Sequence, residues 1–326
     1  MATSMYQAQA AAAKDIRTLF AQLADRIGGI ILRIGSGTDR LSRRQQDAAK
    51  SDINTALDGV FVGPDGRQPY GVDGITPLAA YPRILNTHLG SALEGVVNQH
   101  RSVMQAALPA DVQRWLQNAK PGDLPDYDPP HSWIAPGGQR LSDLIWRNDY
   151  ATRLKLDQAL TEAVQRNLSA EDMARQISGL VRGDRRYITS YVSGANIPYD
   201  ALRLARTTLA AATAQAAIAT AKSNPSVSVG IDWRLSIKHV DYDNCNKKAT
   251  LDGQGNRLKA AYAPDSVPTY PDHPNCLCGL EALLQPNDQA IQKLIQDYRA
   301  GKPAPFTPLA AQFPNVLIGL QKRKAS

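Results

Sequence analysis

The side chains of this sequence that could carry out chemistry gather in one stretch near its C-terminal end. Imidazoles, carboxylates and all three thiols of the chain occur there, as His239, Asp241, Asp243, Cys245, Asp252, His273, Cys276 and Cys278. Cysteine sulfur and histidine nitrogen are preferred ligands of zinc. A tetrahedral zinc ion could therefore gather its ligands from this stretch. The candidate ligands are Cys245, His273, Cys276 and Cys278, with His239 as a further one.

The spacing of the cysteines leaves a second interpretation open. A single residue separates Cys276 from Cys278, and Lys248 stands where a Cys-x-x-Cys pair beginning at Cys245 would end. Buried free cysteines commonly behave as small apolar side chains. Zinc binding and apolar packing both remain candidate roles for these thiols, and zinc is the one cofactor that the sequence suggests.

Known catalytic and ion-binding templates do not fit this stretch. A zinc deaminase needs His-x-Glu followed by Pro-Cys-x-x-Cys, whereas residues 274–278 read Pro-Asn-Cys-Leu-Cys. Residues 241–246 place a thiol and an amide where a calcium loop needs oxygen ligands and glycine. No phosphate-binding Gly-x-x-x-x-Gly-Lys-Ser/Thr loop occurs. The sequence therefore predicts a protein that is not an enzyme. The alternative is a nucleic-acid-acting enzyme or an injected toxin that uses the Asp, His and Cys side chains.

Two strands are predicted to position these groups. Residues 227–237 alternate between apolar and polar side chains, with Trp233 on the apolar side, which predicts one buried and one wet face. The apolar face leads directly to His239. Residues 276–284 alternate again and begin with Cys276 and Cys278. The residues between the two strands, 241–273, are predicted to form a polar loop.

The rest of the chain has the periodicity of helices. Apolar residues recur at steps of three and four from Ala13 to Ile34, and Gly35-Ser36-Gly37 ends that pattern. Further helices are predicted from Thr38 to 57, 85–107, 141–167, 169–180 (capped by Ser169), 201–222 and 287–300. His100 lies on an apolar helix face, where a packed imidazole with satisfied hydrogen bonds is expected. The fold class is α+β: a predominantly helical N-terminal portion and a small β-containing C-terminal module.

The division into parts follows the composition. A Gly- and Pro-rich loop at 62–77 and a Pro-rich arm at 120–138 interrupt the helices. We predict a helical region at 1–139 that includes this arm, a second helical region at 140–224, and a small α+β module at 225–326. A long arm is unusual inside a compact monomer, so it suggests contacts made in an assembly.

The charge of the chain favours a polyanionic partner. It has 326 residues, 37 Lys and Arg against 30 Asp and Glu, and a pI of about 9.3. Candidate contacts to DNA phosphates are Arg182, Arg185, Arg186, Lys322, Arg323 and Lys324. Three cysteines, an odd number, fit a reducing cytoplasm rather than a disulfide framework. No secretory signal or membrane-spanning segment is expected.

An ordered set of motifs in the last third resembles a known family. Residues 201–207 read Ala-Leu-Arg-Leu-Ala-Arg-Thr on an alanine-rich helix, and they precede a strand with Trp233, Leu251-Asp252-Gly253, and His273-Pro274-Asn275-Cys276-Leu277-Cys278. This set resembles the phage minor head protein family, the Mu F-like or head morphogenesis proteins. The chain departs from the family pattern at four positions, namely Thr208, Asn244, Lys248 and Leu277. The resemblance covers about residues 200–284. It implies a structural motif formed by Arg206, Trp233, Asp252, His273, Cys276 and Cys278.

The resemblance implies a structural role in a virus particle. Such a protein is a minor component of a tailed-phage capsid, associated with the portal vertex and acting in head assembly or in genome packaging and ejection. The implied partners are the portal protein, the major capsid protein and packaged DNA bound without sequence preference, with no membrane in the assembled head. The implied location is the virion, after assembly in the host cytoplasm. A DNA-binding protein that acts outside the particle is a further alternative.

Overall fold

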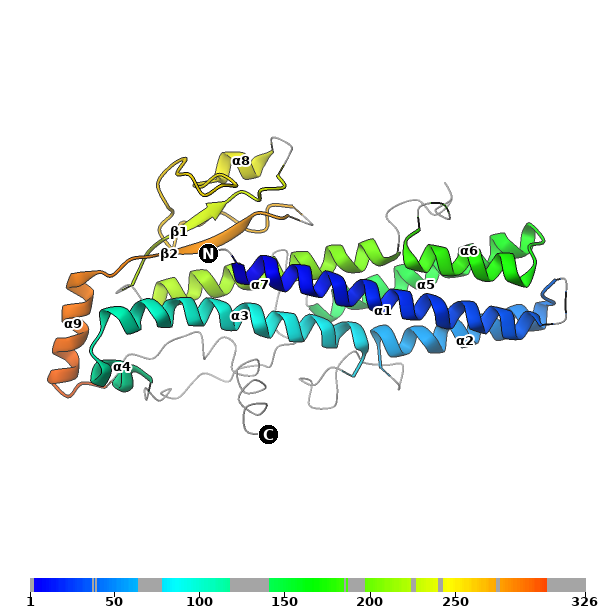
Figure 1. Cartoon of the computed structure of the whole chain (residues 1–326), viewed down its shortest axis with the longest axis horizontal. Coiled ribbons are helices and arrows are strands. Elements are labelled where there is room, and N and C mark those ends of the chain that lie inside the picture. The colour runs from blue at the N-terminus through cyan, green and yellow to red at the C-terminus, as the bar shows by residue number, and fades with distance from the viewer. Residues whose placement is uncertain are drawn as a thin grey trace. The chain divides into compact units, whose positions relative to one another are not determined.

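Helices form most of the chain that the structure describes. The computed structural model describes residues 3–36, 38, 40–63, 78–117, 141–184, 186, 197–223, 227–239, 243–273 and 276–303. The Pro-rich arm at 120–138, residues 64–77, Asp241, Pro274-Asn275, Arg185 and the tail Lys322, Arg323 and Lys324 lie outside these residues. Within them, a small two-stranded antiparallel sheet accompanies the helices (Figure 1), so the predicted α+β class is confirmed.

The elements follow one another along the chain as a long series of helices and then a mixed module. The helices are α1 (Thr3–Gly35), α2 (Arg43–Phe61), α3 (Ala80–Ala107), α4 (Ala110–Gln117), α5 (Leu141–Gln165), α6 (Ala170–Arg182), α7 (Ile197–Ser223), α8 (Asn244–Lys248) and α9 (Asp288–Arg299). The strands are β1 (Ser228–Arg234) and β2 (Gly279–Leu284). None of the described helices is long and apolar enough to cross a bilayer.

The described residues group into two compact units, each assembled from separate stretches of chain. One unit draws on residues 10–87 and 131–205, and the other on residues 1–9, 88–130 and 206–326. These units are discontinuous in sequence, whereas the three predicted regions are consecutive stretches. The candidate metal-binding residues all belong to the second unit.

An apolar core fills the unit formed by residues 10–87 and 131–205, which we call the helical unit. The predicted seam of α1 is buried, including Ile16, Phe20 and Ile27, and it packs with residues of α2, α5 and α6. Phe20 and Phe61 stack in a tilted arrangement with ring centroids 6.1 Å apart. The apolar periodicity of α1 therefore correctly predicted which face is buried.

Caps fix the helix boundaries in this unit. The predicted start of the second helix at Thr38 is wrong, because α2 begins at Arg43. Ser42 accepts a hydrogen bond from the Gln45 amide, and the Gln45 side chain returns a bond to the Ser42 amide. The predicted cap at Ser169 is confirmed, since its hydroxyl accepts a bond from the Asp172 amide. Gly183 ends α6 in the left-handed conformation, with a φ of 79°.

The second unit contains the sheet and its own core. In the antiparallel pair, Trp233 of β1 lies opposite Leu280 of β2. The fully buried Trp233 packs with residues of α7 and α8 and with all three cysteines. Separately, Val112 of α4 packs with Ile291 of α9. The α9 helix was predicted, whereas α4 and α8 were not.

The strand predictions need correction at their ends and on one face. The strand β1 ends at Arg234, before Ile237, whose side chain is 80% exposed. The face predicted to be wet is covered, since Asp232 is buried and bonded to Thr250 and Arg257, whereas Val229 on the face predicted to be buried is 45% exposed. Ile231 also exchanges backbone hydrogen bonds with Tyr262 along the edge of the strand. A Cβ at Gly230 would lie 3.1 Å from the Tyr262 carbonyl oxygen, so the small residue permits this close approach. Likewise β2 begins at Gly279, and Cys276 and Cys278 precede the strand rather than belonging to it.

Candidate metal centre

The short helix α8 presents the first thiol. Asp243 caps this helix, and its carboxylate accepts a hydrogen bond of 2.7 Å from the Cys245 amide. The Asn246 side chain accepts a bond of 2.9 Å from the Asp243 amide, which completes a reciprocal capping box. The cap fixes Cys245 in the first turn, with its side chain fully buried.

The chain that leads into β2 presents the other ligands. The Cys276 amide donates a hydrogen bond of 3.3 Å to the His273 carbonyl oxygen, which turns both side chains toward α8. Two residues later, the Cys278 carbonyl oxygen accepts a bond of 2.5 Å from the Tyr270 hydroxyl. The Tyr270 ring in turn meets Trp233 edge to face, with centroids 5.2 Å apart. A buried aromatic pair therefore anchors the backbone beside the thiols.

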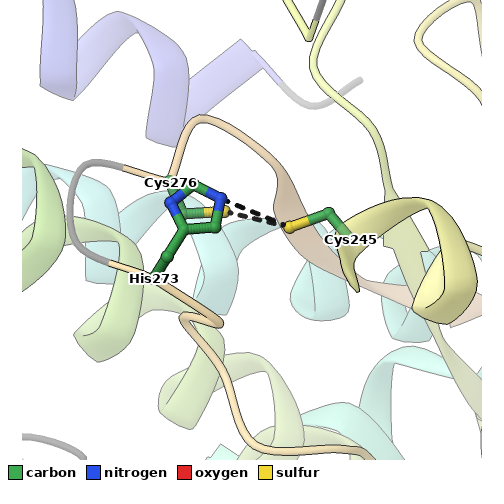
Figure 2. Close-up of side chains that lie close together, drawn as sticks. All are labelled: Cys245, His273 and Cys276. Atoms are coloured by element: carbon green, nitrogen blue, oxygen red, sulfur yellow. Dashed lines mark hydrogen bonds between the residues drawn. The ribbon is translucent and has the colours of Figure 1, made fainter. Parts of the chain in front are cut away.

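Three side chains converge at the centre of this arrangement. Figure 2 shows the His273 imidazole and the Cys276 thiol both directed at Cys245. The Cys245 sulfur lies 3.6 Å from the Cys276 sulfur and 3.6 Å from Nε2 of His273. All three donor atoms lie within 4.8 Å of one another, so this group could hold a metal ion. Both thiols are buried, while His273 is partly open to solvent.

Cys278 and His239 extend the cluster. The Cys278 sulfur lies 3.7 Å from Nδ1 of His239. Nε2 of His239 lies 2.8 Å from the same Asn246 oxygen that accepts the Asp243 amide. Because that oxygen is an acceptor, Nε2 of His239 must carry the proton, which leaves Nδ1 as the unprotonated nitrogen of the neutral ring. The predicted approach of His239 to the thiols is therefore observed, although a turn after β1 brings it there rather than the strand itself.

The three thiols share charge. Hydrogen bonds from Cys245, and then from Cys276, lower the pKa of the Cys278 thiol to about 4. The pKa of Cys245 is raised, because its hydrogen bonds to Cys276 and Cys278 favour its protonated form and burial adds to the effect. The cluster thus favours one thiolate supported by its neighbours, and a cation bound among the sulfurs would stabilise further thiolates.

The carboxylate of Asp243 lies against both imidazoles. One of its oxygens is 3.4 Å from Nε2 of His239, and the other is 3.3 Å from Nε2 of His273. Metal-bound histidines usually have a carboxylate or carbonyl partner in the surrounding shell. Asp243 therefore caps the helix that carries Cys245 and contacts the ring nitrogen of His239 that faces away from Cys278. In His273 it contacts the same Nε2 that faces Cys245, so the surrounding-shell role applies to His239 only.

The other residues of the predicted structural motif lie outside this cluster. Asp252 closes a turn, because one of its oxygens accepts bonds from the amides of Gln254 and Asn256 at 2.9 and 2.8 Å. Trp233 is a core residue beneath the site. The carbonyl oxygen of Arg206, on α7, accepts a bond of 3.4 Å from Gln9.

The described candidates for DNA contact are engaged within the protein. Arg182 forms an ion pair with Asp25, and Arg186 forms one with Asp184 at 2.6 Å. Each pair reduces the positive charge that the arginine offers to a phosphate. The remaining candidates, Arg185 and the tail lysines and arginine, lie outside the described residues.

Several residues of the site were not found by the sequence reasoning. Asn246 supplies the oxygen between Asp243 and His239, and Tyr270 holds the Cys278 carbonyl. The signal for Asn246 was available: Asp243 followed three residues later by an amide side chain is the spacing of a capping box. Nothing in the local pattern indicated Tyr270, because its partner lies in a different turn of the chain.

Comparisons of the chain with protein-family models, with curated proteins and with solved structures gave no match.

Proposed function

We propose that this chain is a structural minor component of a tailed-phage head, whose C-terminal module is fastened by a zinc ion. The observation that carries the proposal is the convergence of Cys245, His273 and Cys276 from two separate segments. A cation bound there would tie α8 to the chain entering β2. The resemblance of residues 200–284 to minor head proteins supplies the biological setting of the proposal.

The distances suit zinc. Bonds of about 2.3 Å to sulfur and about 2.0 Å to nitrogen, at tetrahedral angles, place two sulfurs about 3.8 Å apart and sulfur and nitrogen about 3.5 Å apart. The corresponding distances from Cys245 are 3.6 Å to the Cys276 sulfur and 3.6 Å to the His273 nitrogen. Cys278, whose sulfur lies beside the cluster at 3.7 Å from Nδ1 of His239, is the proposed fourth ligand, although its sulfur is not among the three converging donor atoms.

The composition of this ligand set favours a structural ion over a catalytic one. Structural zinc sites use four protein ligands, whereas catalytic sites keep one position open for water or substrate. Three thiols and one imidazole fill a tetrahedron, and all three thiols are buried. Asp243, the carboxylate nearest the imidazoles, is already engaged as the cap of α8. These features support a fastening role rather than hydrolysis.

Metal analysis of the purified full-length protein tests the zinc part of the proposal. We expect one zinc ion per chain, with zinc lost from Cys276→Ser and from His273→Ala. His88→Ala is the matched control, because His88 belongs to the same unit but not to the cluster, and it should keep its zinc. A protein that contains no zinc after growth in zinc-supplemented medium, or a His273→Ala variant that binds zinc as the parent does, contradicts this assignment.

The proposed partners are the portal protein, the major capsid protein and packaged DNA. Purified particles should contain this chain in low copy number, and the chain should co-purify with portal rings. Particles that assemble, package DNA and infect normally without it would contradict the role in the head. A zinc-loaded protein that hydrolyses nucleic acid, and loses this activity in a folded Asp243→Ala variant, would favour the enzymatic alternative instead.

A further inference from the structure

An ion pair joins the two segments that carry the candidate ligands. Lys248 lies one helical turn after Cys245 on α8, and its ammonium contacts the carboxylate of Asp272. Asp272 directly precedes His273. Both side chains of the pair are mostly shielded from solvent, so the attraction between them is less screened than in an exposed pair. The pair therefore connects the backbone next to one ligand with the backbone next to another.

The same ammonium lies against the aromatic pair beneath the site. Nζ of Lys248 is 5.4 Å from the centroid of the Trp233 ring, which is within the range of a cation–π contact. Trp233 packs edge to face with Tyr270, and the Tyr270 hydroxyl holds the Cys278 carbonyl. Lys248 thus contacts the segment of His273 directly and that of Cys278 through two side chains, Trp233 and Tyr270.

A hydrogen bond to the backbone also holds this C-terminal end of α8. The Lys248 carbonyl oxygen accepts a hydrogen bond of 2.8 Å from the Tyr262 hydroxyl. A helix of five residues has little stability of its own, so its position depends on such tertiary contacts. Beside the contacts of Cys245 itself, the Lys248–Asp272 pair spans directly from α8 to the segment of His273.

We propose that Lys248 and Asp272 are positioning residues of the zinc site, which set the separation between Cys245 and His273. This inference rests on the proposed zinc site. Neither residue is a ligand: the ammonium has no lone pair, and Asp272 is engaged by it. Their effect is to hold the donor atoms close to tetrahedral separation before the ion arrives, which reduces the conformational freedom lost on binding.

Zinc affinity of full-length variants, measured by competition with a chromogenic chelator, tests this inference. Lys248→Met and Asp272→Asn should each weaken zinc binding about 10-fold to 100-fold, the usual effect of residues that support metal ligands. The double variant should be no weaker than the weaker single variant, because either change breaks the same pair. Lys247→Met, on the same short helix, is the matched control and should bind zinc as the parent does.

Two further readouts separate positioning from a general loss of stability. Lys248→Arg keeps the positive charge and should restore most of the affinity. Cobalt bound to Lys248→Met should give the same sulfur-to-cobalt charge-transfer intensity per bound ion as the parent, because the ligands are unchanged. Asp272→Asn, which is nearly isosteric, provides the test if Lys248→Met does not fold.

The possible outcomes distinguish the positioning role of Lys248 and Asp272 from the proposed zinc site on which it rests. A parent protein that binds no zinc contradicts the proposed site itself. A parent that binds zinc together with Lys248→Met and Asp272→Asn variants that bind it equally tightly overturns only the positioning role. A Lys248→Arg variant as weak as Lys248→Met also overturns it, because the role then does not depend on the charge.

Discussion

Removing Arg257 should destabilise the C-terminal module more than removing the carboxylate that it binds. The described residues of this module are 227–239, 243–273 and 276–303. The Asp232 side chain, on β1, is only 5% exposed. It accepts hydrogen bonds from both terminal nitrogens of Arg257, one of them at 3.0 Å, and a bond of 2.8 Å from the Thr250 hydroxyl. In Arg257→Ala the carboxylate of Asp232 stays buried, and of the hydrogen bonds just named it keeps the one from the Thr250 hydroxyl.

The magnitude follows from which group is left behind. Removing one partner of a fully buried ion pair costs about 3–5 kcal/mol, and because only the carboxylate of this pair is buried we expect the low end, about 3 kcal/mol, for Arg257→Ala. Asp232→Ala should cost about 2 kcal/mol, because the remaining guanidinium can be hydrated and one neutral hydrogen bond is weakened. The Arg257 side chain is already 43% exposed. The Thr250 hydroxyl can still donate to the Trp233 carbonyl oxygen at 3.4 Å.

Hydrogen exchange of the β1 amides is the suitable assay, because it reports unfolding of this module separately from the rest of the chain. The Ile231 and Trp233 amides are bonded to Tyr262 and Thr250, so their protection measures closure of this region. Asp265→Ala, which removes an ion pair whose carboxylate is 86% exposed, is the control and should cost under about 0.5 kcal/mol. The reasoning is refuted if Asp232→Ala lowers the free energy of opening as much as, or more than, Arg257→Ala.

Neighbouring glycines of α1 should respond in opposite directions to alanine. Gly29→Ala should raise the free energy of unfolding by about 0.5–1 kcal/mol, because a Cβ there meets no atom within 4 Å. Gly28→Ala should lower the free energy of unfolding by about 1–3 kcal/mol, because its Cβ would lie 2.6 Å from Oγ of Ser178. Thermal unfolding of both variants tests whether one is stabilised and the other destabilised. Burial lowers the pKa of His100, although its bond to the Val96 carbonyl opposes this. As pH falls below about 6.5, His100 takes up a proton in the unfolded chain more readily than in the folded protein, so the free energy of unfolding should fall. Urea unfolding at a series of pH values should show a smaller decrease of this free energy for His100→Gln than for the parent. A His100→Gln profile parallel to that of the parent would contradict this effect.

The helices could be predicted because their signal is local. The seam of α1 repeats over many turns, so its buried face follows from residue spacing alone. The start of α2 was missed because Thr38 and Ser42 are both good caps. Only Ser42 has Gln45 at the spacing that returns the bond. The choice between two adequate caps thus depended on a second side chain.

One face of β1 could not be predicted, because distant chain covers it. The polar alternation of Gly230 and Asp232 is typical of a wet face. In the structure both residues are buried under the segment that contains Arg257 and Tyr262. A buried carboxylate with a paired arginine has the same local sequence pattern as a solvated one, and the partner lies 25 residues away.

At the candidate site, too, the ligand types could be predicted from the sequence, whereas the elements that present them could not. The residue types pointed to sulfur and imidazole ligands, and Cys245, His273 and Cys276 do converge. The unconventional Cys-x-Cys spacing matters little, because Cys245 meets His273 and Cys276, which a turn-type bond between their backbones brings together, and Cys278 is not needed for this convergence. The helix that presents Cys245 was predicted as loop, since five residues are too few for a periodic pattern.

The shortness of α8 would link a metal bound at Cys245 to the folding of the module. An isolated helix of this length does not persist in water, because each end leaves backbone groups without partners and nucleation is unfavourable. In the structure Asp243 satisfies the first turn, and the Cys245 carbonyl oxygen accepts the Ala249 amide. The remaining stability must come from what the side chains contact, and the only fully buried side chain of α8 is Cys245. Because so little apolar area anchors this helix, the free energy of zinc binding to Cys245 would act as folding free energy of the whole segment from Asp243 to Cys278.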